Sequence, residues 1–170
     1  MFVFENLDDK TRSLMLQELE YDLGRGTIFF DIRLKEGAKV RYIELLREAL
    51  EYGTPEIFSE AILGQQLLKE TETRDLGEKQ IRAKISNIAH YNIGEGEFNR
   101  YYMRAICLLA IQNSLDEVEV YRAKQVSKPR PASAERMKAE ELLDHLRTTN
   151  ISVKGSFPGP NSGRSIRFPK

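Results

Sequence analysis

One segment of the chain, residues 95–113, is apolar on almost every side of the helix that it predicts. Its apolar positions recur at helical spacing along one face and its flanks: Phe98, Tyr101, Tyr102, Ala105, Ile106, Leu108, Leu109 and Ile111. A helix of this kind needs other elements around it, because few of its sides can face water. At 170 residues the chain is long enough for one such core but short for two domains. We therefore expect this helix to be the hub of a single core.

Four further helices are predicted by apolar spacing and by residues that begin helices. The first follows Asp8 or Asp9 near its N-cap, and residues 38–52 carry a wide apolar face. The helix over 54–68 has the clearest start, because it opens with a threonine that can cap and a proline that fits the first turn. A last helix, within 133–148, is capped by its first serine or a neighbour.

Strand patterns are shorter and weaker. Residues 27–34 are rich in β-branched and aromatic side chains and predict a short strand or an extended linker. Residues 80–86 and 117–125 alternate apolar with polar positions and predict two more strands. The polar segment 69–80 predicts a surface loop or a frayed helix end.

The sequence thus predicts a mainly α fold, with α+β possible. We expect a compact body of about five helices with two or three short strands and an extended C-terminal arm. Residues 1–126 are expected to form an acidic α-rich body, residues 127–149 a linker and a final helix that packs on this body, and residues 150–170 an extended basic arm.

Charge is divided along the chain although its total is zero. Residues 121–170 hold eleven Lys and Arg against four acids, a net charge of +7, whereas residues 1–120 hold 15 against 22, a net charge of −7. In an assembly of identical subunits, the basic end of one copy could meet the acidic body of the next. Alternatively, both halves mix on the surface of one globule.

The last twenty residues, 151–170, lack acids and cannot bury a core of their own. Their prolines and glycines exclude a continuous helix, and their isolated apolar side chains suit an extended strand that fills pockets on another surface. We predict a partner-binding arm whose contact residues are Val153, Phe157, Arg164, Ile166, Arg167 and Phe168.

A second basic segment lies before the final helix. Arg122, Lys124, Lys128 and Arg130 form a possible basic strip. Basic residues interleaved with aromatic ones can bind nucleic acid by neutralising phosphates and stacking on bases. The strip could also grip an acidic protein surface, and no recognition-helix pattern accompanies it.

Residue types that carry catalysis or bind metals are sparse. His90, His145 and Cys107 show no zinc-type spacing, so neither a metal nor a cofactor is expected. A single cysteine excludes an internal disulfide and agrees with a reducing compartment. No spacing resembles that of a serine, cysteine or metal-dependent hydrolase, and we expect a non-catalytic protein.

Two arginines interrupt the apolar hub helix. Arg100 and Arg104 could reach together for a phosphate or a partner carboxylate. Alternatively, Glu97 pairs with Arg100 along the helix, and Arg104 extends its aliphatic stem over the core. An enzyme that uses Glu97, Arg100, Tyr101 or His90 in a cleft is a third hypothesis.

Three segments carry a weak resemblance to known sequences. EGEFNRYYMRAIC, EVEVYRAKQVSKPRPAS and GPNSGRSIR resemble small uncharacterised proteins of bacteria and tailed phages. The resemblance brings no activity and no residue role. It implies a virion-associated subunit, because small non-catalytic phage chains often hold their neighbours with extended arms.

Together these observations predict a structural or assembly protein, a subunit of a multi-copy particle such as a phage head or head-tail connection. Its partner is expected to be protein, either itself or a neighbouring subunit; the alternative is a nucleic-acid-associated regulatory protein. No apolar run approaches the roughly 20 residues that cross a bilayer, and the N-terminus has acids where a signal peptide needs a basic start. We expect no membrane contact and a location in the cytoplasm of a bacterial host or in a virion.

Overall fold

The computed structural model describes residues 2–77, 79–124, 135–149, 157–159 and 162–169. The elements in chain order are α1 (Asp9–Arg25), the 3-10 turn η1 (Glu36–Ala38), α2 (Lys39–Tyr52), α3 (Pro55–Gly64), β1 (Thr71–Leu76), β2 (Lys79–Lys84), α4 (Ala89–Gln112), β3 (Glu117–Arg122), β4 (Arg136–Lys138), α5 (Ala139–Thr148) and β5 (Arg164–Arg167). The mainly helical α+β fold is therefore confirmed, with more strands than the two or three predicted.

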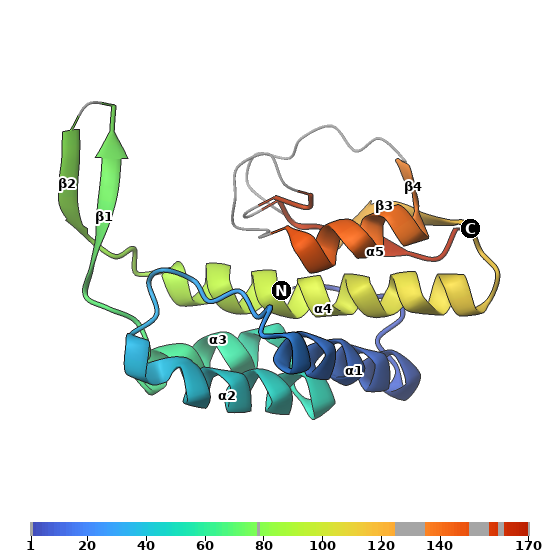
Figure 1. Ribbon diagram of the computed structural model, residues 1–170, viewed down its shortest axis with the longest axis horizontal. Coiled ribbons are helices and arrows are strands. Elements are labelled where there is room, and N and C mark those ends of the chain that lie inside the picture. The colour runs from blue at the N-terminus through green and yellow to red at the C-terminus, as the bar shows by residue number, and fades with distance from the viewer. Residues whose placement is uncertain (1, 78, 125–134, 150–156, 160–161, 170) are drawn as a thin grey trace.

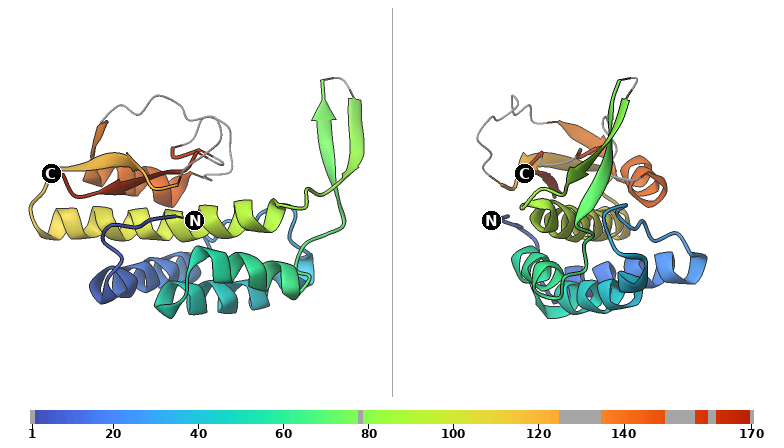
Figure 2. Two further views of the ribbon diagram at one scale, coloured as in Figure 1. Left: turned by 180° about the vertical axis from the view of Figure 1, so that it is seen from behind. Right: turned by 90° about the vertical axis from the view of Figure 1, so that its left-hand side faces the viewer.

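Helix α4 is the central element of the molecule. Helices α1, α2 and α3 lie on one side of it, and α5 lies with the β4-β3-β5 sheet on the other side (Figures 1 and 2). Most of its 24 residues are buried, including Phe98, Tyr102 and Ile106. The prediction that this helix forms the hub of the core is confirmed. None of the described helices has the length and apolarity to cross a membrane.

Helix α4 begins earlier than the sequence predicted. It starts at Ala89 rather than near residue 95, so Gly94 lies inside the helix. A Cβ atom at Gly94 would lie only 2.3 Å from the Oγ of Ser59 on α3. The glycine therefore serves close packing between two helices, a requirement that local sequence does not reveal.

The predicted helix caps are present. The side chains of Asp8 and Thr54 each accept a hydrogen bond from the backbone N–H three residues ahead, over 2.8 and 3.2 Å. Helix α3 ends at Gly64 and not near residue 68, because the chain turns at Gln66, which has a φ of 53°. The cap predicted for the last helix, at residue 133, lies outside the described residues.

Of the two alternatives predicted for residues 27–34, a strand or an extended linker, the structure has a linker; a single β-bridge, between Leu34 and Leu68, is its only strand-like pairing among the described residues. One local prediction was wrong. The segment 69–80 is not a loop, because β1 within it pairs antiparallel with β2. The strand expected over 80–86 is confirmed as β2, and that expected over 117–125 as β3.

The three-stranded sheet joins the three parts that the sequence suggested. Strand β3 belongs to residues 1–126, β4 to 127–149 and β5 to 150–170, and both outer strands pair antiparallel with β3. Val120 on β3 and Ile166 on β5 are directly paired across the sheet, and both are buried. The C-terminal segment thus completes the sheet that covers α4.

Candidate functional site

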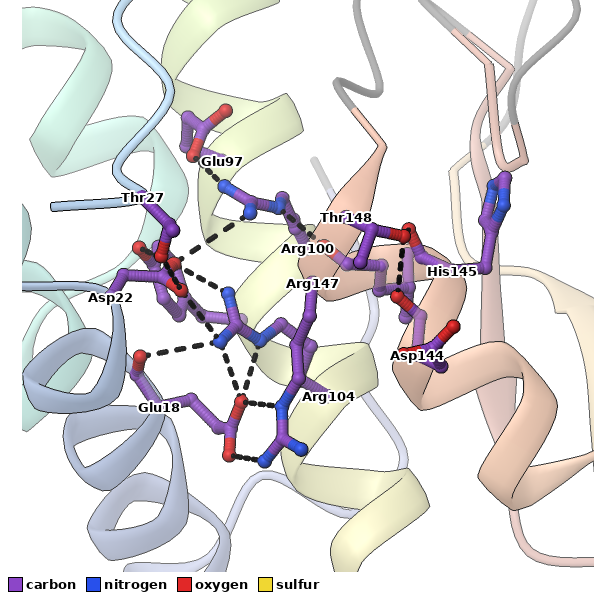
Figure 3. Close-up of polar contacts among 12 residues, drawn as sticks. Glu18, Asp22, Thr27, Glu97, Arg100, Arg104, Asp144, His145, Arg147 and Thr148 are labelled. Atoms are coloured by element: carbon purple, nitrogen blue, oxygen red, sulfur yellow. Dashed lines mark hydrogen bonds and ion pairs between the residues drawn. The ribbon is translucent and has the colours of Figure 1, made fainter. Parts of the chain in front are cut away.

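A cluster of charged side chains lies inside the core, between α1, α4 and α5 (Figure 3). Helices α1 and α4 supply all of it except one arginine from α5. Its members are Glu18, Asp22, Glu97, Arg100, Arg104 and Arg147. Three cations thus face three carboxyl groups within the core.

Arg104 connects the two carboxylates of α1. Its Nη1 and Nη2 donate to the two oxygens of Asp22 over 2.6 and 3.0 Å, and its Nε donates to Glu18 over 2.7 Å. Arg147 donates from Nε to the same Glu18 oxygen over 2.9 Å, so helix α5 is tied to α1. The hydroxyl of Tyr101 donates to Asp22 over 2.9 Å. The carboxylates are therefore hydrogen-bonded as well as ion-paired, as buried charges require.

Arg100 holds a second set of contacts. Its Nη1 donates to Glu97 over 3.3 Å, which confirms the pair that the helical spacing predicted. Its Nε donates to the carbonyl of Leu146 on α5 over 3.0 Å, and its guanidinium lies 4.7 Å from the ring centre of Phe29. Arg104 differs from the prediction, because it is enclosed and paired and does not extend over the core surface.

This cluster has the architecture of a structural network. Arg100, Arg104 and Asp22 are 0% exposed, so a ligand has no surface of theirs to contact. Burial raises the pKa of the Glu97 carboxyl, and the nearby Arg100 only partly opposes this effect. Burial likewise raises the pKa of Tyr101. A buried network of this kind orients helices relative to one another.

The described part of the predicted arm packs against the rest of the same chain. Ile166 is fully buried in the sheet, and Phe157 and Phe168 pack against the core. Ser165 donates to the Asn99 side chain over 2.6 Å, which fastens β5 to α4. Val153 lies outside the described residues. The predicted anchors that are described are therefore occupied within the chain, and their binding to a partner stays a prediction.

The arginines of the arm also find acids on the same chain. Arg164 pairs with Glu135, beside β4, and lies over the ring of Phe157. Arg167 pairs with Glu119 on β3 and with Glu5, the latter over 2.6 Å. Part of the charge division seen in the sequence is thus neutralised inside the folded molecule.

The possible basic strip is only partly described. Arg122 lies half-buried at the end of β3. Lys124 forms an ion pair with Glu95 on α4, so its charge is compensated. Lys128 and Arg130 lie outside the described residues. Nucleic-acid binding by this strip remains a prediction.

The remaining candidate groups are separate from one another. Cys107 is buried in α4, and burial raises the pKa of its thiol. His145 on α5 contacts Thr149 through Nδ1, at 3.3 Å. His90 lies in the first turn of α4, beside the ring of Tyr91. Within the described part of the chain, no group of three or more His, Cys, Asp or Glu could hold a metal ion.

Another candidate surface is a hairpin that is exposed to solvent. The hairpin of β1 and β2 projects away from the helical body (Figures 1 and 2). Strand β2 is exposed along most of its length, and Ile81 is 41% exposed. An isolated two-stranded hairpin is only marginally stable in water. Its outer edges therefore offer a surface for another strand.

The sequence contained a signal for this hairpin. Only two residues, at 77 and 78, connect its strands, and Gly77 adopts a φ of +64°. A glycine in a two-residue connection is typical of hairpins. The signal was missed because β1 is polar and lacks the β-branched apolar residues that mark a buried strand.

Comparisons with models of known protein families, with curated proteins and with solved structures gave no match.

Proposed function

We propose that the protein is a non-catalytic assembly subunit that joins neighbouring copies of itself through the free edge of β1. The projecting hairpin is the observation that carries this proposal. Backbone N–H and C=O groups at the edge of a two-stranded sheet can pair with a strand from a second molecule. The net charge of zero puts no overall repulsion between copies.

The charge pattern of β1 is complementary to itself. Glu72 and Arg74 lie on the same face of β1, one on each side of Thr73, and form an ion pair within the strand over 2.6 Å, which the intermolecular contact would extend into a network of four charges. If two copies of β1 pair antiparallel about Thr73, Glu72 of each copy lies opposite Arg74 of the other. Opposite charges at directly facing positions stabilise a sheet by about 0.2–1 kcal/mol per pair. Two such pairs would set the register of the contact.

The edge of β2 is less suited to this role. It carries Lys79, Arg82 and Lys84, all of them exposed. Two copies of β2 would bring like charges together, and lysine on an edge strand is a common means of preventing pairing. The charges of the hairpin therefore favour association through β1.

Removing the hairpin tests the proposal. The backbone N–H of Ile85 donates to the carbonyl of Glu70 over 3.0 Å, so the two ends of the hairpin lie side by side. Two glycines can replace residues 71–84 and close a β-turn at this point. We expect wild-type protein to associate in sedimentation velocity and the deletion variant to be a monomer with unchanged helical circular dichroism. Monomeric wild-type protein at every concentration, or an associating deletion variant, would overturn the proposal.

Charge reversal gives a sharper test. Glu72→Arg and Arg74→Glu should each produce monomers, because like charges then face each other across the contact. An equimolar mixture of the two variants should associate again, because each charge then finds its opposite. Lys79→Glu on β2 is the matched control and should associate like the wild type. A mixture that stays monomeric would contradict pairing through β1.

Only the sequence resemblance indicates the kind of particle to which such an assembly would belong. That resemblance suggests a virion particle, as in a head or head-tail connection. The alternative, a nucleic-acid-associated regulatory protein, predicts a gel shift that weakens steeply as salt rises. Absence of a shift at low salt would remove this alternative.

A further inference from the structure

A groove lies at the base of the hairpin, where β1 begins at Thr71 and β2 ends at Lys84. It runs between the end of α3, the segment that follows it and the first turn of α4, and has a volume of about 630 Å³. Small-molecule sites commonly have volumes of about 300–1,000 Å³. The groove is therefore large enough for an organic ligand.

The rim of the groove is cationic. Lys35, Lys69 and Lys84 line it, with Glu70 as the acid among its lining residues. The Nζ of Lys35 donates to the carbonyl of Gln66 over 2.6 Å, and the Nζ of Lys69 donates to that of Ile32 over 2.7 Å. An ammonium group carries three donors, so each of these two lysines keeps donors for a ligand. The excess of cations favours an anion.

A buried histidine adds a polar group without a partner. His90 lines the groove and is 5% exposed, and its Nε2 forms no hydrogen bond with any described group. A buried polar atom left without a partner is costly, so its presence beside a groove points to a ligand. The same turn of α4 has no side-chain cap at Ile88. The positive end of the helix dipole therefore lies at the groove and also favours an anion.

The floor of the groove is apolar. Ile62, Leu63, Leu68 and Ile85 line it, and Leu63 is 50% exposed. A bare inorganic ion would leave this surface in contact with water. Burial of apolar surface would instead favour a ligand with a hydrocarbon portion.

From these observations we infer that the groove binds a small amphiphilic anion: one carboxylate or phosphate group on an apolar body. Lys69, Lys84 and the first turn of α4 hold the anionic group, and the leucine and isoleucine side chains contact the apolar body. The imidazole of His90 lies in the wall of the groove beside them. This site does not depend on association through β1, because Glu72 and Arg74, the charges proposed for that contact, are not among the residues that line the groove.

Calorimetry with octyl phosphate and octanoate, both below their micelle-forming concentrations, tests the inference. We expect one molecule of at least one anion to bind per chain, and the comparison distinguishes phosphate from carboxylate preference. Inorganic phosphate and the uncharged octyl glucoside should bind far more weakly, since each lacks one of the two portions. Equal binding of octyl glucoside, or no binding of either anion, would overturn the inference.

Matched lysine variants locate the site. Lys84→Gln and Lys69→Gln should each weaken binding about tenfold, as expected for one lost charged hydrogen bond. Lys79→Gln, on the same hairpin but outside the groove, should leave affinity unchanged. Equal losses in Lys79→Gln and Lys84→Gln would indicate nonspecific attraction and overturn the assignment. Glu72→Arg should bind like the wild type, so failure of the groove and failure of the proposed assembly can be told apart.

Discussion

The guanidinium of Arg104 binds both oxygens of the Asp22 carboxylate, over 2.6 and 3.0 Å, and both side chains are completely enclosed. This pair connects α4 to α1. Because both side chains are buried, water cannot replace either partner. The charges must therefore be compensated within the network, and loss of one partner leaves the others buried without it.

Replacement of Arg104 should be strongly destabilising. Arg104→Met keeps much of the volume but leaves Asp22 and Glu18 with less compensation, and we expect a loss of about 3–5 kcal/mol in the free energy of unfolding. Urea unfolding measures it. Arg47→Met is the control, because Arg47 forms an exposed pair with Glu20 and should cost no more than about 1 kcal/mol. Similar losses in the two variants would contradict a structural network.

Stability should depend on the ionisation of Glu97. Burial raises the pKa of this carboxyl in the folded chain. Its stabilising contribution is therefore complete below the ordinary glutamate pKa of about 4.3 and is lost as pH rises through the folded value. Glu97→Gln removes this loss, so the stability of the variant relative to the wild type should increase with pH. Urea unfolding from acid to neutral pH measures the difference, and a difference that stays constant with pH would contradict the prediction.

The reactivity of the single thiol, at Cys107, should report global unfolding of the chain. Cys107 is buried within α4, and burial raises the pKa of its thiol, so the reactive thiolate is scarce in the folded state. We expect no rapid reaction with Ellman's reagent in native buffer and one reactive thiol per chain in urea. Fast labelling of the native protein would show that α4 opens locally.

The contribution of β5 can be measured at one side chain. Ile166 is completely buried against α4, and Ile166→Ala should cost about 2–5 kcal/mol. Ile81→Ala, on the exposed hairpin, should change the free energy of unfolding by no more than about 0.5 kcal/mol. Denaturant unfolding of both variants makes the comparison. Equal small effects would show that β5 is not docked in solution.

A cross-link can establish that β5 pairs with its own chain. Glu119 and Arg167 lie directly opposite each other on β3 and β5. With Cys107→Ser in the background, Glu119→Cys and Arg167→Cys should form a disulfide within one chain. A non-reducing gel should then show oxidised monomers. Oxidised dimers would instead place β5 on a neighbouring subunit.

Much of the helical fold was predictable because its causes are local. The cap at Asp8 acts within one turn of its helix, and the apolar positions around Phe98 and Ile106 follow the helical repeat. The predicted start of α4 was wrong because Gly94 was taken for a helix boundary. The glycine is instead needed inside the helix, where it packs closely against Ser59 on another helix. The alternation over residues 80–86 predicted β2, but its partner β1 was missed because its sequence, TETRDL, is almost entirely polar.

The amino-acid sequence alone determined that the highly apolar helix over residues 95–113 must lie at the centre of one core. It also determined that residues 151–170, which are poor in core residues, must pack on another surface. Only the tertiary structure decided which surface that is: Ile166 pairs opposite Val120 of the same chain. It also decided that Arg104 is enclosed by Asp22 and Glu18 and is not available to a ligand. These outcomes depend on contacts between residues more than forty positions apart, which spacing along a single helix or strand cannot specify.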